Sequence, residues 1–211
     1  MEKGVINILA VGSHPDDVEL GCGGTLVKHI SKGDGVFVII LTNGERGGHC
    51  AERKECLRSL ANLGIPESNI FFGNFPDGYV EDNQKTVEYI ESIIIKHGIN
   101  RVYTHSPKDR HQDHRNCGNA VSSAARKVPE IFLFEGPSTL SVFEPHYFIG
   151  INEEELNKKL NSLKNYESQI KKGIVNLRAI EQLSGFIGAK RGLDYGEAFE
   201  INHILKIGDD I

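Results

Sequence analysis

The fold is decided by the stretch Val5-Ile6-Asn7-Ile8-Leu9-Ala10-Val11-Gly12-Ser13-His14-Pro15-Asp16-Asp17. Its first half, Val5 to Val11, is a mostly apolar run without alternation, which predicts a strand of a parallel sheet that is covered on both faces. An imidazole and two carboxylates follow directly. Ligands of open α/β sheets bind at the carboxyl ends of the strands, so this segment predicts a site at that edge.

A second polar cluster follows a second predicted strand about a hundred residues later. Arg101-Val102-Tyr103-Thr104 is the strand, and His111-Gln112-Asp113-His114 is the cluster. Catalytic zinc usually has three protein ligands, with nitrogen and oxygen donors, and one position open for water or substrate. His14, one of the two aspartates and one histidine of the second cluster would complete such a set if the two strands border the same crevice.

Strands and helices are predicted to alternate along the chain, which is typical of a layered α/β domain with a mostly parallel sheet. The predicted strands are Val5–Val11, Val36–Leu41, Asn69–Phe72, Arg101–His105, Ile131–Phe134 and His146–Ile151. The predicted helices are Gly24–Lys32, Ala51–Leu63, Gln84–His97 and a segment from Asp113 or His114 to Lys127. From Glu153 onward the pattern is helical, with apolar stripes at Leu156, Leu160 and Leu163 and at Ile174, Leu177 and Ile180.

Length and composition limit the function further. The 211 residues fit one domain, 1–211, and the net charge of -5 offers no large basic face for nucleic acid. No apolar stretch is long enough for a membrane span, and the amino terminus lacks a secretory cleavage pattern, which predicts a cytoplasmic protein. Cys22, Cys50, Cys56 and Cys117 lack the spacing of a metal or redox motif, so reduced thiols are expected, with Cys22 as a buried packing residue.

The two clusters offer complementary chemistry. Consecutive aspartates allow one carboxylate to bind metal and the other to act as general base on the attacking water. His111 and His114 lie three positions apart, on one face of a helical turn, so one can bind metal while the other stabilises an oxyanion. Spacing alone leaves these roles open. The structural alternative is a hydrogen-bonded strand-end histidine and an aspartate helix cap. The other histidines, His29, His49, His97, His105, His146 and His203, are interpreted as structural or surface residues.

The first motif continues as Glu19-Leu20-Gly21-Cys22-Gly23-Gly24-Thr25-Leu26, and together with His111-Gln112-Asp113-His114 it resembles the LmbE-like or PIG-L family of zinc-dependent de-N-acetylases. Leu41-Thr42-Asn43-Gly44-Glu45, Tyr166-Glu167-Ser168-Gln169 and Tyr195-Gly196-Glu197-Ala198-Phe199 extend the match over almost the whole chain. The resemblance implies a Rossmann-like three-layer αβα sandwich. It also implies removal of the N-acetyl group from a GlcNAc-type amino sugar or its conjugate.

The resemblance assigns residues by motif position. It implies that His14, Asp17 and His114 ligate one Zn2+ per chain, that Asp16 is the general base, and that His111 stabilises the oxyanion. Asp113 would orient and charge His111, and Arg53 would contact substrate hydroxyls. Fe2+ or Co2+ fits the same ligands. A homo-oligomer formed through the helical tail is expected.

The leading hypothesis is a metal-dependent amidohydrolase with a small acetamido sugar as its substrate. The alternative is a catalytically silent, metal-dependent sugar-binding protein of the same fold, against which the presence of Asp16 and His111 argues. A metallophosphoesterase is disfavoured because two-metal sites need a denser ligand cluster. Two features concern the rest of the substrate. The loop from Gly73 to Asn83 is predicted to form a wall of the pocket. Four arginines lie near the crevice loops, where they either pair with an anionic group of the aglycone or solvate a loop. These arginines are Arg46, Arg53, Arg110 and Arg115.

Overall fold

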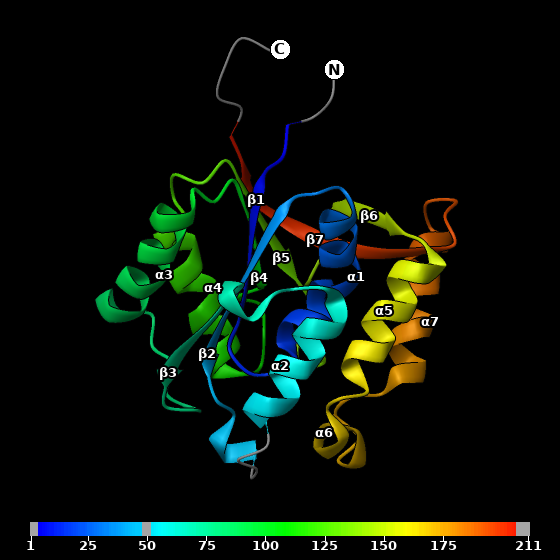
Figure 1. Ribbon diagram of the computed structural model, residues 1–211, viewed down its shortest axis with the longest axis horizontal. Helices are drawn as coiled ribbons and strands as arrows, with labels where there is room; N and C mark the ends of the chain where they lie inside the picture. Colours follow the sequence, from blue (N-terminus) through cyan, green and yellow to red (C-terminus); the bar gives the residue numbers. More distant parts are fainter. Residues whose placement is uncertain (1–3, 48–51, 206–211) are drawn as a thin grey trace.

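The computed structural model describes residues 4–47 and 52–205, in which strands and helices alternate as predicted (Figure 1). The strands are β1 (Asn7–Gly12), β2 (Gly35–Thr42), β3 (Ile70–Phe75), β4 (Arg101–His105), β5 (Glu130–Phe134), β6 (Tyr147–Ile151) and β7 (Tyr195–Ile204). The helices are α1 (Asp17–Ser31), α2 (Glu52–Leu63), α3 (Gln84–His97), α4 (Gln112–Ala124), α5 (Glu153–Leu163), α6 (Glu167–Lys171) and α7 (Leu177–Ala189). Short 3-10 turns occupy Glu45–Gly47 and Glu67–Asn69. None of these helices has the length and apolar character that crossing a bilayer requires.

The strands form one sheet of seven in the order β3-β2-β1-β4-β5-β7-β6. Neighbouring strands from β3 to β5 are parallel, and β7 is antiparallel to both β5 and β6. β1 lies at the centre of the parallel part, where Val11 pairs with Ile39 of β2 and with Thr104 of β4. The predicted mostly parallel sheet is therefore confirmed.

Helices cover both faces of the sheet, which explains why the central strands are apolar without alternation. Ile8 and Ala10 point toward the core under α1 and α2, whereas Leu9 and Val11 belong to the second core cluster, under α3 and α4. In Figure 1, α3 and α4 lie on one side of the sheet and α1, α2, α5 and α7 on the other. The result is a three-layer αβα arrangement.

The chain changes direction in the sheet between β1 and β4. After β1 it moves outward to β2 and β3, and then crosses back to place β4 on the other side of β1. Such a switch point leaves a crevice at the carboxyl ends of the two strands, because the connections leave in opposite directions. The His14 segment follows β1 directly, and the His111 segment follows β4. The topology therefore brings the two predicted clusters to one crevice.

The helical interpretation of the C-terminal part is wrong for its last segment. Residues Tyr195–Ile204 form β7, which inserts between β5 and β6. Glycine and two glutamates in this segment are atypical of a buried strand. Tertiary partners overcome this: Ser106 and Lys108 contact the Glu200 carboxylate, and Lys159 pairs with Glu197. In addition, Ile174 lies in the turn before α7 rather than on a helical stripe.

Helix α1 begins seven residues before the predicted Gly24, at Asp17, and is broken at Cys22, whose φ of -147° and ψ of 16° are not helical. A buried ion pair occupies the break. The Lys159 ammonium donates to the carbonyl of Leu20 at 2.8 Å, and the Glu197 carboxylate accepts from the amides of Gly24 and Thr25 at 3.0 and 2.7 Å. These are backbone groups that a regular helix would pair with one another. Lys159 and Glu197 are each 3% exposed and lie 2.5 Å apart.

Candidate active site

Both predicted clusters lie in one cleft at the carboxyl ends of β1 and β4. The cleft has a volume of about 720 Å³, which is within the range of small-molecule sites. Its lining includes five of the predicted site residues: His14, Asp16, Asp17, His111 and His114. The predicted wall from Gly73 to Asn83 contributes Asp77 and Gly78.

Three donor groups in this cleft lie close to one another. His14 Nδ1 is 3.3 Å from His114 Nε2, and each nitrogen lies 3.4 Å from a different oxygen of Asp17, Oδ2 for His14 and Oδ1 for His114. Tetrahedral zinc with nitrogen and oxygen ligands at about 2.0–2.1 Å separates its donors by about 3.3–3.4 Å. The spacing of His14, Asp17 and His114 therefore fits one shared cation.

The far side of His14 is held by two carboxylates. Its Nε2 lies 3.2 Å from an oxygen of Asp113 and 3.2 Å from an oxygen of Asp77. A proton on Nε2 donated to these acceptors leaves Nδ1 as the free lone pair, directed toward His114 and Asp17. Histidine ligands of metals commonly have such a carboxylate partner, which fixes the tautomer and the ring orientation.

The other two donors are held in the same way. His114 Nδ1 lies 3.3 Å from Asp109 Oδ2 and 3.2 Å from Ser138 Oγ, which leaves its Nε2 facing the shared point. Asp17 Oδ2 accepts from the backbone amide of His14 at 2.7 Å and lies 2.9 Å from His105 Nε2. Asp17 Oδ1, the oxygen nearest to His114, is on the side of the shared point.

Three overlapping sets of His and Asp donors in the described residues have ligand atoms within 4.8 Å of one another: His14 with His111 and His114, Asp17 with His105 and His114, and His14 with Asp77 and Asp113. The set of His14, Asp17 and His114 draws on all three. Each of its residues is also held by another partner on its far side.

The charges of the surrounding groups favour a cation at this point. Burial lowers the pKa of His14, but hydrogen bonds with Asp113, Asp17 and Asp77 reverse the effect and raise it well above its usual value. Burial raises the pKa of Asp17, yet His114 and His105 bring it well below the ordinary range. Carboxylates that stabilise imidazolium in the absence of metal stabilise a divalent ion in the same place once the histidines are deprotonated.

Asp16 has a strained backbone. Its φ of 93° places a non-glycine residue in the left-handed region, which costs of the order of 1–3 kcal/mol and is frequent at functional sites. Although Asp16 stands at the N-cap of α1, its side chain makes no capping hydrogen bond. The side chain is instead part of the cleft lining beside Asp17. The helix-cap interpretation therefore does not explain Asp16.

The structure separates Asp113 from the role of orienting His111. The Asp113 carboxylate is buried, accepts from the amides of Gly78 and Val80 at 2.7 and 3.2 Å, and contacts His14. Its backbone amide, rather than its side chain, meets His111, donating to Nδ1 at 3.2 Å. That bond places the proton of a neutral His111 on Nε2. Burial and the neighbouring His14 and His114 lower the pKa of His111, and the charges of Asp113 and Asp17 only partly oppose this, so the neutral ring is favoured.

Arg53 does not line the cleft. Its guanidinium lies 4.0 Å from the ring of Phe72 and 3.4 Å from the side-chain oxygen of Asn74, so a cation–π contact holds it against β3. The other three arginines considered from the sequence are cleft residues: Arg46, Arg110 and Arg115. Arg115 donates to the carbonyls of Asp109 and Arg110 and thus supports the loop that carries His111.

Sequence reasoning missed three residues of the site. His105 was interpreted as structural or surface, but it is 1% exposed, contacts Asp17 and stacks on His114 with ring centroids 4.0 Å apart. Its place as the last residue of β4, before the second polar cluster, was the available signal. Asp77 and Asp109 were also missed. The available signals were the place of Asp77 in the loop predicted as a wall of the pocket and the place of Asp109 two residues before His111.

The three cysteines that the structure describes do not take part in the cluster. Cys22, Cys56 and Cys117 are free thiols buried in the two cores, and burial raises the pKa of each. The prediction of reduced thiols, with Cys22 as a packing residue, agrees with this environment. Cys50 and His49 lie outside the described residues.

Comparison with known sequences relates the chain to deacetylases. The sequence profile of the PIG-L family, described as GlcNAc-PI de-N-acetylase, matches residues 9–125. The uncharacterized deacetylase YaiS of Escherichia coli K12 is 36% identical over 170 residues, which are 76% of this chain and 90% of YaiS. The diacetylchitobiose deacetylase of Thermococcus kodakarensis is 26% identical over 222 residues, covering 92% of this chain and 82% of that enzyme.

Solved structures share the fold over nearly the whole chain. The conserved protein TT1542 from Thermus thermophilus superposes with a TM-score of 0.83 at 25% identity, covering 97% of this chain and 98% of its own. The 4-carboxy-2-hydroxymuconate hydratase GalB from Pseudomonas putida KT2440 superposes with a TM-score of 0.84 at 18% identity, covering 98% and 100% of the two chains. A hydratase with this architecture shows that the fold alone does not decide the reaction.

Proposed function

The chain belongs to the PIG-L family of GlcNAc-PI de-N-acetylases and is an enzyme, and on that premise we propose that it is a zinc-dependent hydrolase that removes the N-acetyl group from a GlcNAc-type amino sugar or its conjugate. The observation that carries the proposal is the convergence of His14, Asp17 and His114: the two ring nitrogens lie 3.3 Å apart, and each is 3.4 Å from one of the two Asp17 oxygens. Each of the three residues also has a partner on its far side.

In this proposal His14 Nδ1, His114 Nε2 and one oxygen of Asp17 hold the ion. A zinc ion bound there supplies Lewis acidity toward the acetyl carbonyl oxygen and lowers the pKa of a water molecule. The three ligands are kept in their orientation by Asp77 and Asp113 at His14, by Asp109 at His114 and by His105 at Asp17. The buried carboxylates also offset the positive charge of the ion.

The chain's own residues perform the proton transfers. Asp16 accepts a proton from the attacking water and returns it to the nitrogen of the leaving amine, so that amide and water become amine and acetate. His111 Nε2–H donates a hydrogen bond to the carbonyl oxygen as negative charge develops on it. The strained backbone of Asp16 keeps the carboxylate in the cleft instead of at the helix end.

The experiment measures metal content and acetate release together. Elemental analysis of the purified protein is expected to find about one zinc ion per chain, and iron or cobalt at that stoichiometry would replace zinc in the proposal. Chelation should abolish acetate release from N-acetylglucosamine, diacetylchitobiose and GlcNAc conjugates, and zinc should restore it. Metal-loaded protein that releases no acetate from any acetamido sugar would refute the proposed activity.

Asp16→Asn tests the role of the general base. Loss of the proton acceptor should lower kcat by about 10²–10⁴-fold with zinc content unchanged, because Asp16 is not among the three ligands. Asp82→Asn, at an exposed acid of the loop before α3, is the matched control and should keep full activity. An Asp16→Asn enzyme with unchanged kcat, or one that has lost its zinc, would contradict the assigned role.

A further inference from the structure

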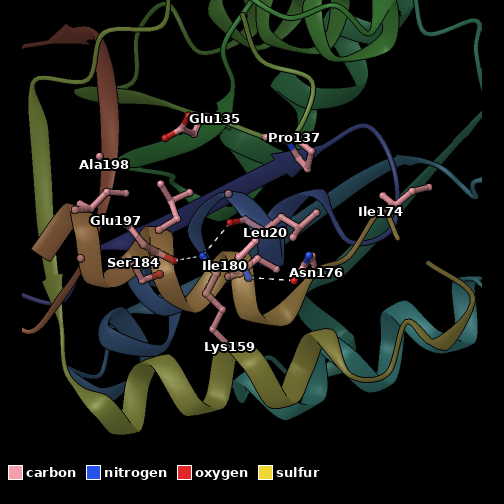
Figure 2. A pocket seen from close by; sticks show the side chains of 16 residues that line it. Leu20, Glu135, Pro137, Lys159, Ile174, Asn176, Ile180, Ser184, Glu197 and Ala198 are labelled. Atoms are coloured by element: carbon pink, nitrogen blue, oxygen red, sulfur yellow. Dashed lines mark hydrogen bonds and ion pairs between the residues drawn. The ribbon is translucent and has the colours of Figure 1, made fainter. Parts of the chain in front are cut away.

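A second cavity, of about 360 Å³, adjoins the cleft (Figure 2). Leu20, Pro137 and Ile174 line both hollows. Leu20 lies one helical turn after Asp17, and Pro137 precedes Ser138, whose hydroxyl is 3.2 Å from His114. The second cavity therefore begins within one turn of helix of the proposed zinc ligands.

The walls of the second cavity are mainly apolar. α7 supplies much of one side, and Figure 2 shows Ile180 on this helix near Leu20, with Pro137 farther along the wall. The apolar lining consists of Leu20, Pro137, Ile174, Ala179, Ile180, Leu183, Ile187 and Ala198. Such a surface favours an apolar occupant, since each Å² removed from water contributes roughly 25 cal/mol.

Charged groups in the second cavity are neutralised by contacts in the protein. Lys159 and Glu197 form the ion pair at the break in α1, and their remaining hydrogen bonds go to the backbone of that helix. Glu135 is half-buried; burial raises the pKa of its carboxyl group, whereas Lys190 and Lys159 act in the opposite direction. Among the charged lining residues, Lys159 and Glu197 therefore have each other as counter-charge, and the apolar side chains make up most of the wall.

The rim leaves apolar surface in water. Ile174 is 50% exposed and Leu183 is 44% exposed, and both border the cavity. Exposed apolar side chains around a hollow next to a reaction centre are typical of a ligand site. In contrast, the neighbouring cleft is lined by charged residues that include Arg46, Arg110, Arg115 and Asp77. The combined space therefore has a polar part and an apolar part.

We propose that the second cavity is a subsite for an apolar chain or ring carried by the amino-sugar substrate. The subsite rests on the proposed function, because the sugar must place its amide at the zinc ligands while the apolar group extends past Leu20. Two parts of a substrate supply this chemistry: an N-acyl group longer than acetyl, and an apolar aglycone on the glycosidic oxygen.

The test compares N-acetylglucosamine with its hexyl β-glycoside and with N-hexanoylglucosamine. For the zinc-loaded enzyme, kcat/KM of one hexyl substrate should exceed that of N-acetylglucosamine by at least about tenfold, because several methylenes leave water. A gain for the glycoside assigns the subsite to the aglycone, and a gain for the hexanoyl amide assigns it to the acyl group.

Ala179→Trp fills the second cavity from the exposed surface of α7, and Ala189→Trp is the matched control on the same helix, away from the cavity. The first variant should remove the gain for the hexyl substrate and leave N-acetylglucosamine unaffected, whereas the second should change neither. Calorimetry measures binding of the hexyl glycoside apart from turnover when it is done with the Asp16→Asn protein, with and without Ala179→Trp. If the aglycone is the occupant, Ala179→Trp should raise the Kd for the hexyl glycoside about tenfold.

Hydrolysis of N-acetylglucosamine without a higher kcat/KM for either hexyl substrate would overturn the subsite and leave the deacetylase proposal standing. An equal loss of the hexyl gain in Ala179→Trp and Ala189→Trp would have the same consequence. A dimer in sedimentation that Ala179→Trp dissociates, with hexyl substrates unaffected, would identify a second copy as the occupant and also overturn it. Absence of amide hydrolysis with every substrate would overturn the proposed function and, with it, the subsite.

Discussion

Replacement of Lys159 with methionine tests the ion pair that occupies the break in α1. Methionine keeps much of the length and apolar volume of the lysine stem but removes the ammonium group. The change leaves the Glu197 carboxylate, 3% exposed, without its counter-charge, and it leaves the carbonyl of Leu20 without the 2.8 Å donor. Both losses occur in a pair that is almost inaccessible to solvent, although it borders the second cavity.

The expected cost follows from the burial of the pair. Removing one partner of a buried ion pair typically destabilises a protein by about 3–5 kcal/mol, and the two amides that still donate to Glu197 favour the lower end. For a chain of this size, about 2–4 °C of Tm is lost per kcal/mol, which predicts a decrease of about 6–20 °C.

Urea unfolding followed by circular dichroism measures the change, with differential scanning calorimetry for Tm. Lys158→Met is the matched control, because Lys158 is the neighbouring residue on α5, is 47% exposed and pairs with Glu154 at the surface. That variant should stay within about 0.5 kcal/mol of the parent. A Lys159→Met protein that loses less than about 1 kcal/mol would refute the view that the ion pair holds the broken helix.

Three further variants probe the site, the packing and the pH dependence. Asp109→Asn, which weakens the contact with His114 Nδ1, should raise the Kd for zinc about 10–100-fold in chelator competition. Gly24→Ala should cost about 1–3 kcal/mol in urea unfolding, because a Cβ there would lie 2.7 Å from Ile151 Cδ1. Burial lowers the pKa of His29 in the folded protein, so below pH about 6.5 the unfolded chain binds more protons than the folded one. The free energy of unfolding therefore falls as the pH drops from about 6.5 toward the pKa of the folded state. His29→Gln should flatten this part of the profile of urea midpoint against pH.

Each of these variants has a control with a distinct outcome. Asp82→Asn should leave zinc affinity unchanged, and equal weakening by both asparagine variants would contradict a specific role for Asp109. Gly136→Ala should leave the free energy of unfolding nearly unchanged, because nothing lies within 4 Å of a Cβ at that position. If Gly24→Ala cost no more than Gly136→Ala, the packing argument would be contradicted. His146→Gln, at an exposed histidine, should keep the parental profile, and the same profile in the His29→Gln protein would contradict the linkage.

The local pattern of the sequence was sufficient for most of the parallel sheet. The bounds of α3 and β4 agree with their predictions, because an apolar stripe ending in Gly98 and a short apolar run between turns are strong local signals. The strand β7 was missed because its buried glutamates are stabilised by lysines from distant segments. Local propensity contains no information about those partners.

By itself, the sequence determined that two polar clusters follow two strands, and the family resemblance selected His14, Asp17 and His114 from them. The structure made β1 and β4 neighbours, and the carboxyl ends of neighbouring parallel strands share an edge of the sheet. Only the tertiary structure decided what stands behind these residues: Asp77 and Asp113 at His14, Asp109 at His114 and His105 at Asp17. Those contacts join groups up to 99 residues apart. Their geometry depends on how loops and helices pack, which periodicity and spacing along the chain do not specify.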